Sequence, residues 1–142
     1  MRKRYRRHRE AGFTLIEILI ALVLLGLLAT IAYPQVIKFL EKKADVAKVQ
    51  IESLKSGLDF YRLDLGRYPT QEEGLNALVA APPNQPRWNG PYLKSRQMPA
   101  DPWGRAYVYR VPSRSGQAYD LLSLGADGLE GGEGENRDIS AW

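Results

Sequence analysis

The stretch FTLIEILIALVLLGLLATIAY, residues 13–33, decides what kind of protein this chain is, because it is long, apolar and almost uncharged. As an α-helix it extends about 30 Å, which is enough to cross the hydrocarbon core of a bilayer. Its one charged residue is Glu17. An ionisable side chain inside a membrane span points to a function, whereas one near the interface reaches water at little cost. The position of Glu17 leaves both interpretations open.

The residues before the span are strongly basic. The first 12 residues carry a net charge of +5 and the whole chain carries +4, so residues 13–142 carry −1. The positive-inside rule places the basic head in the cytoplasm and everything after Pro34 on the outer side of the inner membrane, which is the periplasm in a Gram-negative cell. The body lacks the basic face of a nucleic-acid-binding domain, so no nucleic-acid partner is expected.

A secretory signal peptide is the competing interpretation of the N-terminus. Such a signal has a shorter apolar region followed by a cleavage site of small residues. Here the apolar run is longer, and the sequence Tyr33-Pro34-Gln35 that follows it is a poor cleavage site. A retained membrane anchor is therefore favoured.

Residues 35–65 have the pattern of a helix that continues beyond the span. Apolar residues recur at alternating spacings of three and four, which is a heptad stripe. The stripe fits a coiled-coil seam or packing on a sheet of the same chain, and we favour the sheet because the rest of the chain needs a core. Pro34 is expected to kink or interrupt the helix, and Gly66 to end it. The stripe consists of Ile37, Leu40, Ala44, Ala47, Ile51, Leu54, Leu58, Tyr61 and Leu65.

Residues 66–142 predict a small α+β region. Thr70 and Glu73 have the spacing of a capping box at the start of a short helix. Residues 106–111 and 118–124 are strand-like and are joined by a hairpin loop, PSRSGQ. The aromatic residues of this region are expected to pack in the core and in turns: Tyr68, Trp88, Tyr92, Trp103, Tyr107, Tyr109 and Tyr119.

The segment GADGLEGGEGENRDIS, residues 125–140, is rich in acidic residues and glycine. Ca²⁺ takes six to eight oxygen ligands from carboxylates and carbonyls, and glycines let the backbone turn its carbonyls inward. The spacing is not that of an EF-hand. From composition alone, a solvated and mobile acidic loop is the favoured interpretation.

No class of enzyme is indicated. The chain has no Cys, and its only His is His8 in the basic head. It also lacks the nucleophile-elbow, zinc-protease and phosphate-loop motifs. We therefore expect a protein that is not an enzyme.

The hexapeptide GFTLIE, residues 12–17, behind a short basic leader, resembles the processing signal of type IV pilins and type II secretion pseudopilins. The resemblance implies that a prepilin peptidase removes residues 1–12 by cutting after Gly12, and that Phe13 is then N-methylated. It also implies that Glu17 pairs with the N-terminal ammonium of a neighbouring subunit during assembly. Such a pair relieves the desolvation of both charges in a medium of low dielectric constant.

The rest of the chain resembles the major pseudopilin family, the G subunit of type II secretion systems, in the tracts YPTQEEGLNALV, WNGPYL, PADPWGRAYVYR and LLSLGADGLEGGEGENRDIS. The implied fold is type IV pilin-like. A long N-terminal helix, with residues 13–33 in the membrane and 34–65 in the periplasm, packs on a small antiparallel sheet within residues 66–142. A type IV major pilin for adhesion, motility or DNA uptake is the alternative, but it more often carries a Cys pair.

The implied function is that of the major structural subunit of a periplasmic pseudopilus, which pushes folded exoproteins through an outer-membrane channel. The implied partners are further copies of the chain, minor pseudopilins, the prepilin peptidase, the inner-membrane assembly platform and membrane lipid.

The resemblance also implies one structural Ca²⁺ in the C-terminal loop. Its expected ligands are the carbonyl oxygens of Leu124 and Leu129, the carboxylates of Asp127 and Asp138, and an oxygen of Ser140. The other acidic residues of the loop, Glu130, Glu133 and Glu135, are expected to face solvent.

Overall fold

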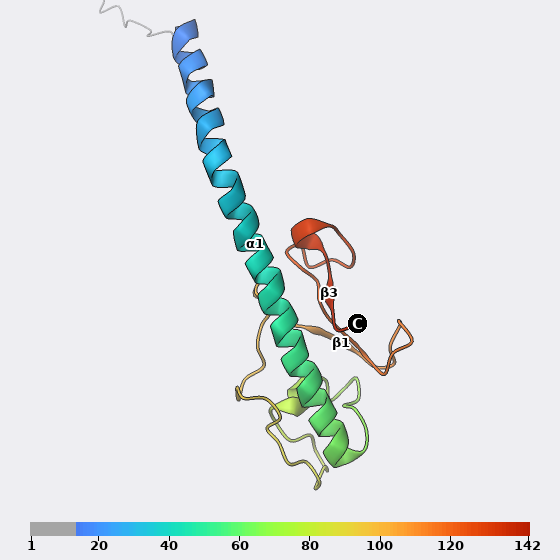
Figure 1. The fold of residues 1–142 in the computed structure, drawn as a ribbon. Coiled ribbons are helices and arrows are strands. Elements are labelled where there is room, and N and C mark those ends of the chain that lie inside the picture. The colour runs from blue at the N-terminus through green and yellow to red at the C-terminus, as the bar shows by residue number, and fades with distance from the viewer. Residues whose placement is uncertain (1–13) are drawn as a thin grey trace, which may run out of the picture. The chain divides into compact units, whose positions relative to one another are not determined.

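The computed structural model describes residues 14–142, in which one long helix, α1, runs from Leu15 to Leu65 (Figure 1). Of the two outcomes expected at Pro34, a kink or an interruption, the interruption is absent, because α1 continues through Pro34 as the helical pattern of residues 35–65 predicted. One proline removes a single backbone donor, and the helix-forming residues on both sides keep their own bonds. The helix ends as predicted, since Gly66 has φ 78° and its N–H donates to the Arg62 carbonyl at 2.7 Å.

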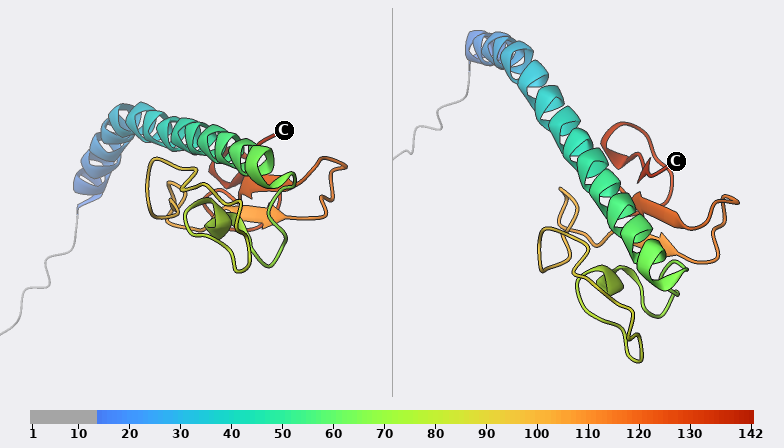
Figure 2. Two further views of the ribbon diagram at one scale, coloured as in Figure 1. Left: turned by 90° about the horizontal axis from the view of Figure 1, so that it is seen from below. Right: turned by 60° about the horizontal axis from the view of Figure 1, so that its bottom comes forward.

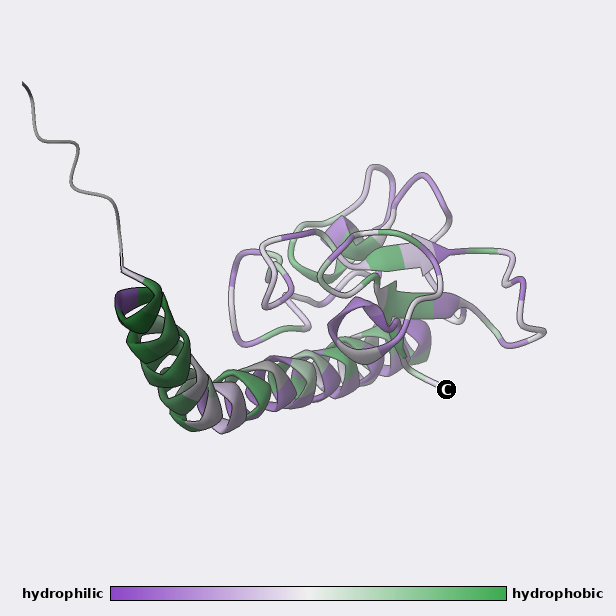
Figure 3. Cartoon of the chain, turned by 90° about the horizontal axis from the view of Figure 1, so that it is seen from above, coloured by the Kyte–Doolittle hydropathy of each residue, from purple (hydrophilic) through white to green (hydrophobic). Residues whose placement is uncertain are grey.

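The chain divides into two compact units, residues 1–38 and 39–142. In the described part of the first unit the large apolar side chains of α1 are exposed, for example Leu22 and Leu25. Figure 3 shows α1 changing along its length from mostly apolar, behind a hydrophilic first turn, to mixed. By length and composition, α1 is the one helix within residues 14–142 that is suited to crossing a membrane.

The second unit holds a three-stranded antiparallel sheet beside the C-terminal part of α1 (Figure 2). Strand β1 is Val108–Arg110, β2 is Asp120–Ser123 and β3 is Ile139–Ser140, in the order β1-β2-β3. The two predicted strands are confirmed with shorter bounds. β3 was not predicted, because two residues within a glycine-rich loop give no pattern of alternation.

From Ala47 to Leu65 the heptad stripe is buried against the chain's own second unit, as the interpretation of packing on the same chain predicted, whereas Ile37 at its start is exposed. Tyr107 of the sheet region donates its hydroxyl to the Gln50 side chain on α1. Each fully buried leucine of the stripe contributes about 1.5–3 kcal/mol to folding. The buried residues of α1 are Ala47, Ile51, Leu54, Leu58, Tyr61 and Leu65.

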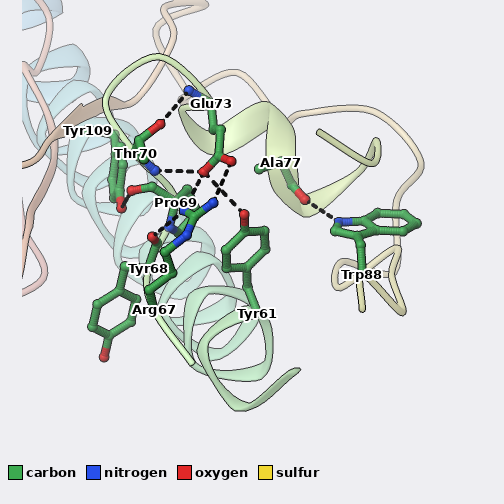
Figure 4. Close-up of polar contacts among 9 residues, drawn as sticks. All are labelled: Tyr61, Arg67, Tyr68, Pro69, Thr70, Glu73, Ala77, Trp88 and Tyr109. Carbon is green, nitrogen blue, oxygen red and sulfur yellow. Dashed lines mark hydrogen bonds and ion pairs between the residues drawn. The ribbon is translucent and has the colours of Figure 1, made fainter. Parts of the chain in front are cut away.

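The predicted capping box after α1 is present and is part of a larger polar cluster (Figure 4). The Thr70 N–H donates to Glu73 Oε2 at 2.8 Å, and the Glu73 N–H donates to Thr70 Oγ1 at 3.2 Å. Arg67 donates to both Glu73 oxygens, and Tyr61 donates its hydroxyl to Oε2 at 3.2 Å. The Arg67 hydrogen bonds lower the pKa of Glu73 to about 2. The helix after the box is the short 3₁₀ helix η1, Leu75–Leu78.

The aromatic side chains pack as expected and close the loops onto the core. Tyr109 is buried and donates to the Pro69 carbonyl at 2.9 Å, and Trp88 Nε1 donates to the Ala77 carbonyl at 2.8 Å (Figure 4). Buried Tyr119 lies against Tyr68 and Tyr109, with ring centroids 4.8 and 5.7 Å away. These aromatic rings therefore pack in the hydrophobic core, as expected.

Candidate functional site

Two of the candidate residues, Gly12 and Phe13, lie outside the described residues. The first candidate within them is Glu17, in the first turn of α1. Glu17 Oε2 accepts hydrogen bonds from the Thr14 N–H at 2.9 Å and the Thr14 hydroxyl at 3.0 Å, and the Glu17 N–H donates to Thr14 Oγ1 at 3.3 Å. This is a capping box. Its T-x-x-E signal is visible in the sequence, but the reasoning from sequence did not use it.

Glu17 therefore has a local role as well as the expected one. In the single chain its carboxylate satisfies donors at the start of α1 that the helix itself leaves free. Only one of its oxygens, Oε2, is engaged by Thr14. The other oxygen remains able to accept from a donor supplied by another molecule.

The C-terminal loop is closed by pairing between its two ends. Strands β2 and β3 pair Ser123 with Ile139, and the Ala126 N–H donates to the Glu135 carbonyl at 2.9 Å. Gly125, with φ 62°, sits where the two arms meet, and a Cβ there would lie 2.7 Å from the Glu135 carbonyl oxygen. Only glycine fits this position.

The five expected calcium ligands lie along this closed loop. The Leu124 carbonyl accepts from the Gly128 N–H at 3.2 Å, and Asp127 Oδ1 accepts from the Leu129 N–H at 3.0 Å. Asp138 Oδ2 accepts from the Gly131 N–H at 2.9 Å, and Ser140 donates its hydroxyl to the Trp142 carbonyl at 2.6 Å. The Leu129 side chain is largely exposed.

One atom of this set fits a cation directly. Asp138 Oδ1 is shielded from solvent and has no hydrogen-bond donor, and a buried acceptor without a donor calls for a partner such as a metal ion. Within residues 14–142, however, no group of three or more acidic or histidine side chains gathers as a metal cluster. The observation that fits a cation is therefore limited to Asp138 Oδ1, and a carboxylate oxygen is a donor that a hard cation prefers.

The glutamates of the loop, Glu130, Glu133 and Glu135, are exposed, as expected. Glu130 also forms an ion pair with Arg110 at the end of β1, and its Oε1 lies 3.7 Å from Arg114 Nη1. Glu130 therefore ties the loop to the hairpin, although its side chain is half exposed.

Reasoning from sequence missed two residues outside the C-terminal loop, Arg105 and Asp101, that hold one arm of the loop in place. Arg105 Nη1 donates to the Gly125 carbonyl at 2.9 Å, and a Cβ on Gly128 would lie 2.6 Å from Arg105 Nε. Buried Asp101 holds this arginine by accepting from its backbone N–H at 2.8 Å, and it also accepts from the Ser123 hydroxyl. The quoted tract PADPWGRAYVYR contained both residues, but its spacing gives no sign of a contact with the loop.

Comparisons with known proteins agree with this architecture. Residues 35–142 match the family described as "Type II secretion system (T2SS), protein G", and residues 7–33 match the "Prokaryotic N-terminal methylation motif". The chain is 45% identical to the type II secretion system core protein G of Pseudomonas aeruginosa, over 96% of this chain and 97% of that protein. It is 44% identical to the Vibrio cholerae protein of the same name, over 94% and 92% of the two chains.

A solved structure is also similar. The major pseudopilin from the type 2 secretion system of enterohaemorrhagic Escherichia coli matches with a TM-score of 0.58 and 36% sequence identity. The match covers 72% of this chain and 88% of that one. The similarity therefore extends to the three-dimensional fold.

Proposed function

Because the chain belongs to the type II secretion system protein G family, we infer that it is a structural subunit of the secretion pseudopilus. The observation that carries this inference is the joint presence, in one chain, of the methylation motif over residues 7–33 and the protein G match over residues 35–142. In this role the subunit polymerises through its helices, and growth of the filament pushes folded exoproteins through the outer-membrane channel. The inner-membrane platform and the minor pseudopilins are its partners in assembly.

The role is structural rather than catalytic. The chain has no Cys, and its only His lies in the leader that processing would remove. A strain that lacks the gene tests the role directly. We expect folded exoproteins to accumulate in the periplasm and the wild-type gene to restore their release. Normal release together with loss of surface pili or motility would instead support the type IV pilin alternative.

Processing is part of the proposal. The peptidase cuts after Gly12, Phe13 receives a methyl group, and the new ammonium meets Glu17 of a neighbouring subunit. Support comes from the methylation motif and from the Glu17 oxygen that Thr14 leaves unused. Glu17→Ala removes the acceptor, so filaments should be lost while the second unit stays folded. Glu41→Ala, which changes an exposed carboxylate later in α1, is the matched control.

The topology is also proposed. The chain is anchored by the apolar part of α1, the leader lies in the cytoplasm, and everything after Pro34 lies in the periplasm. The net charge of +5 in residues 1–12 supports this orientation. Because the chain has no Cys, a single cysteine at exposed Ser115 provides a clean probe. A membrane-impermeant maleimide added to cells with a permeabilised outer membrane should label it, and absence of labelling would contradict the topology.

We further propose that the loop holds one Ca²⁺ through Leu124, Asp127, Leu129, Asp138 and Ser140. The buried Asp138 Oδ1 without a donor supports this. When bound, the ion supplies a structural cross-link between the two arms of a loop that has few apolar side chains. Asp138→Asn should abolish the rise in melting temperature that Ca²⁺ gives, and Glu133→Gln should not. An identical melting temperature of the wild type with calcium and with chelator would refute the site.

A further inference from the structure

Lys55 on α1 lies where the loop returns to the helix. Its Nζ donates to the Ala141 carbonyl at 3.3 Å and lies 4.6 Å from the centroid of the Trp142 ring. It also pairs with Glu52 Oε1 at 3.4 Å. The Lys55 side chain is only 22% exposed, whereas the Glu52 side chain is 67% exposed. Lys55 is therefore turned toward the end of the loop more than toward solvent.

Trp142 is held from a second side by the sheet. Its Nε1 donates to the Tyr119 carbonyl at 3.1 Å, and the two rings lie 5.7 Å apart. The Ala141 N–H donates to the Leu121 carbonyl at 3.0 Å, next to the pairing of β3 with β2. Residues 141 and 142 thus contact both α1 and the sheet, although the Trp142 side chain is 55% exposed.

This clamp, formed by Lys55 with Ala141 and Trp142, joins the candidate calcium loop through Ser140. Ser140 is an expected ligand, and its hydroxyl donates to the Trp142 carbonyl at 2.6 Å. Strand β3 has only two residues, so its pairing alone gives little anchorage to the end of the loop. A contact outside the loop that fixes residues 141 and 142 limits the conformations open to Ser140 and Asp138.

We propose that Lys55 is a positioning residue for the calcium loop: its ammonium holds Ala141 and Trp142 against α1 and so preorganises the β3 end of the loop for the ion. Preorganisation strengthens binding because less ordering remains to be done when the ligand arrives. The effect on affinity rests on the proposed calcium site. The effect on loop order does not, because the clamp contacts contain no metal.

The experiment compares three variants of the full chain in detergent. Lys55→Gln removes the charge, and Lys55→Arg keeps it. The control is Lys48→Gln, since Lys48 also pairs with an acidic residue three positions away on α1, Asp45 at 3.7 Å, but its side chain is 65% exposed and, among residues 14–142, makes no hydrogen bond or ion pair with the loop. Calcium affinity is measured by titration calorimetry. Amide hydrogen exchange of residues 125–142 is measured with chelator present.

We expect Lys55→Gln to weaken calcium binding about three- to tenfold, as loss of a cation–π contact and a hydrogen bond from a charged group implies. Exchange near Ala141 should also become faster without calcium. Lys55→Arg should stay within about twofold of the wild type, and Lys48→Gln should match it in both measurements.

Three results would overturn all or part of the proposal. Unchanged affinity in Lys55→Gln removes the positioning role even if the calcium site is real. If the wild type binds no Ca²⁺, both the calcium site and the effect of Lys55 on calcium affinity are refuted. Amide hydrogen exchange measured without calcium then shows whether the clamp orders the loop. Unchanged exchange in Lys55→Gln overturns the clamp itself. None of these outcomes alters the role of the chain as a filament subunit, which the secretion assay tests separately.

Discussion

Arg67 and Glu73 form a two-pronged ion pair, with Nη1 2.6 Å from Oε2 and Nη2 2.7 Å from Oε1. The Glu73 side chain is only 14% exposed. The pair joins the segment after α1 to the capping box at Thr70, and the Tyr61 hydroxyl joins it to the helix core.

Because of this ion pair, we expect the free energy of unfolding to fall at acid pH. The Arg67 hydrogen bonds lower the pKa of Glu73 from 4.5 to about 2. Because the folded pKa is below the unfolded one, the contribution is complete above about pH 4.5 and is lost as the pH falls toward about 2. Glu73→Gln should cost about 2 kcal/mol at neutral pH and should flatten the pH dependence of urea unfolding in that range. An unchanged acid dependence would contradict the assignment to Glu73.

The free edge of β1 is covered by one side chain. The Gln71 amide donates to the Tyr109 carbonyl at 3.1 Å and accepts from the Val111 N–H at 2.9 Å, so it takes the place of a neighbouring strand. Gln71→Ala should cost about 1–3 kcal/mol in the free energy of unfolding and should promote association through the exposed edge. Light scattering and urea unfolding measure the two effects. Exposed Gln117→Ala is the control, and equal behaviour of the two variants would refute the role of Gln71.

The close approach of the two loop arms at Gly125 gives a matched pair of substitutions. Gly125 and Gly134 have nearly equal φ values, 62° and 61°, but a Cβ meets the Glu135 carbonyl oxygen at 2.7 Å only at Gly125 and meets nothing within 4 Å at Gly134. Gly134→Ala should show the backbone strain alone, about 1 kcal/mol. Gly125→Ala should lower the melting temperature further, because one arm must move. Equal melting temperatures would show that the arms do not meet as described.

The heptad stripe predicts a contrast between two leucines of α1. Leu54 is fully buried against the chain's own core, and Leu63 is 77% exposed. Leu54→Ala should cost about 2–5 kcal/mol in the free energy of unfolding, whereas Leu63→Ala should change it by less than about 0.5 kcal/mol. A coiled-coil seam would instead make the cost at Leu54 depend on protein concentration. Urea unfolding at two concentrations separates the cases.

The long helix, its end at Gly66, the two longer strands and the Thr70–Glu73 box could be predicted because each depends on local pattern. The helical pattern of residues 35–65 predicted that the helix continues beyond the span, but whether Pro34 interrupts it was left open, since the cost of one lost hydrogen bond has to be weighed against many neighbouring ones. Contacts between distant residues were also missed: Arg105 with Gly125, Glu130 with Arg110, and Lys55 with Trp142. These residues come into contact only in the folded chain, and no spacing in the sequence predicts such contacts.

The central claim is that the chain becomes a filament subunit only after its leader is removed. The intact mass of the protein in purified filaments tests it most directly. We predict the mass of residues 13–142 plus one methyl group, with Phe13 as the first residue. Filaments built from chains that still begin at Met1 would contradict the account.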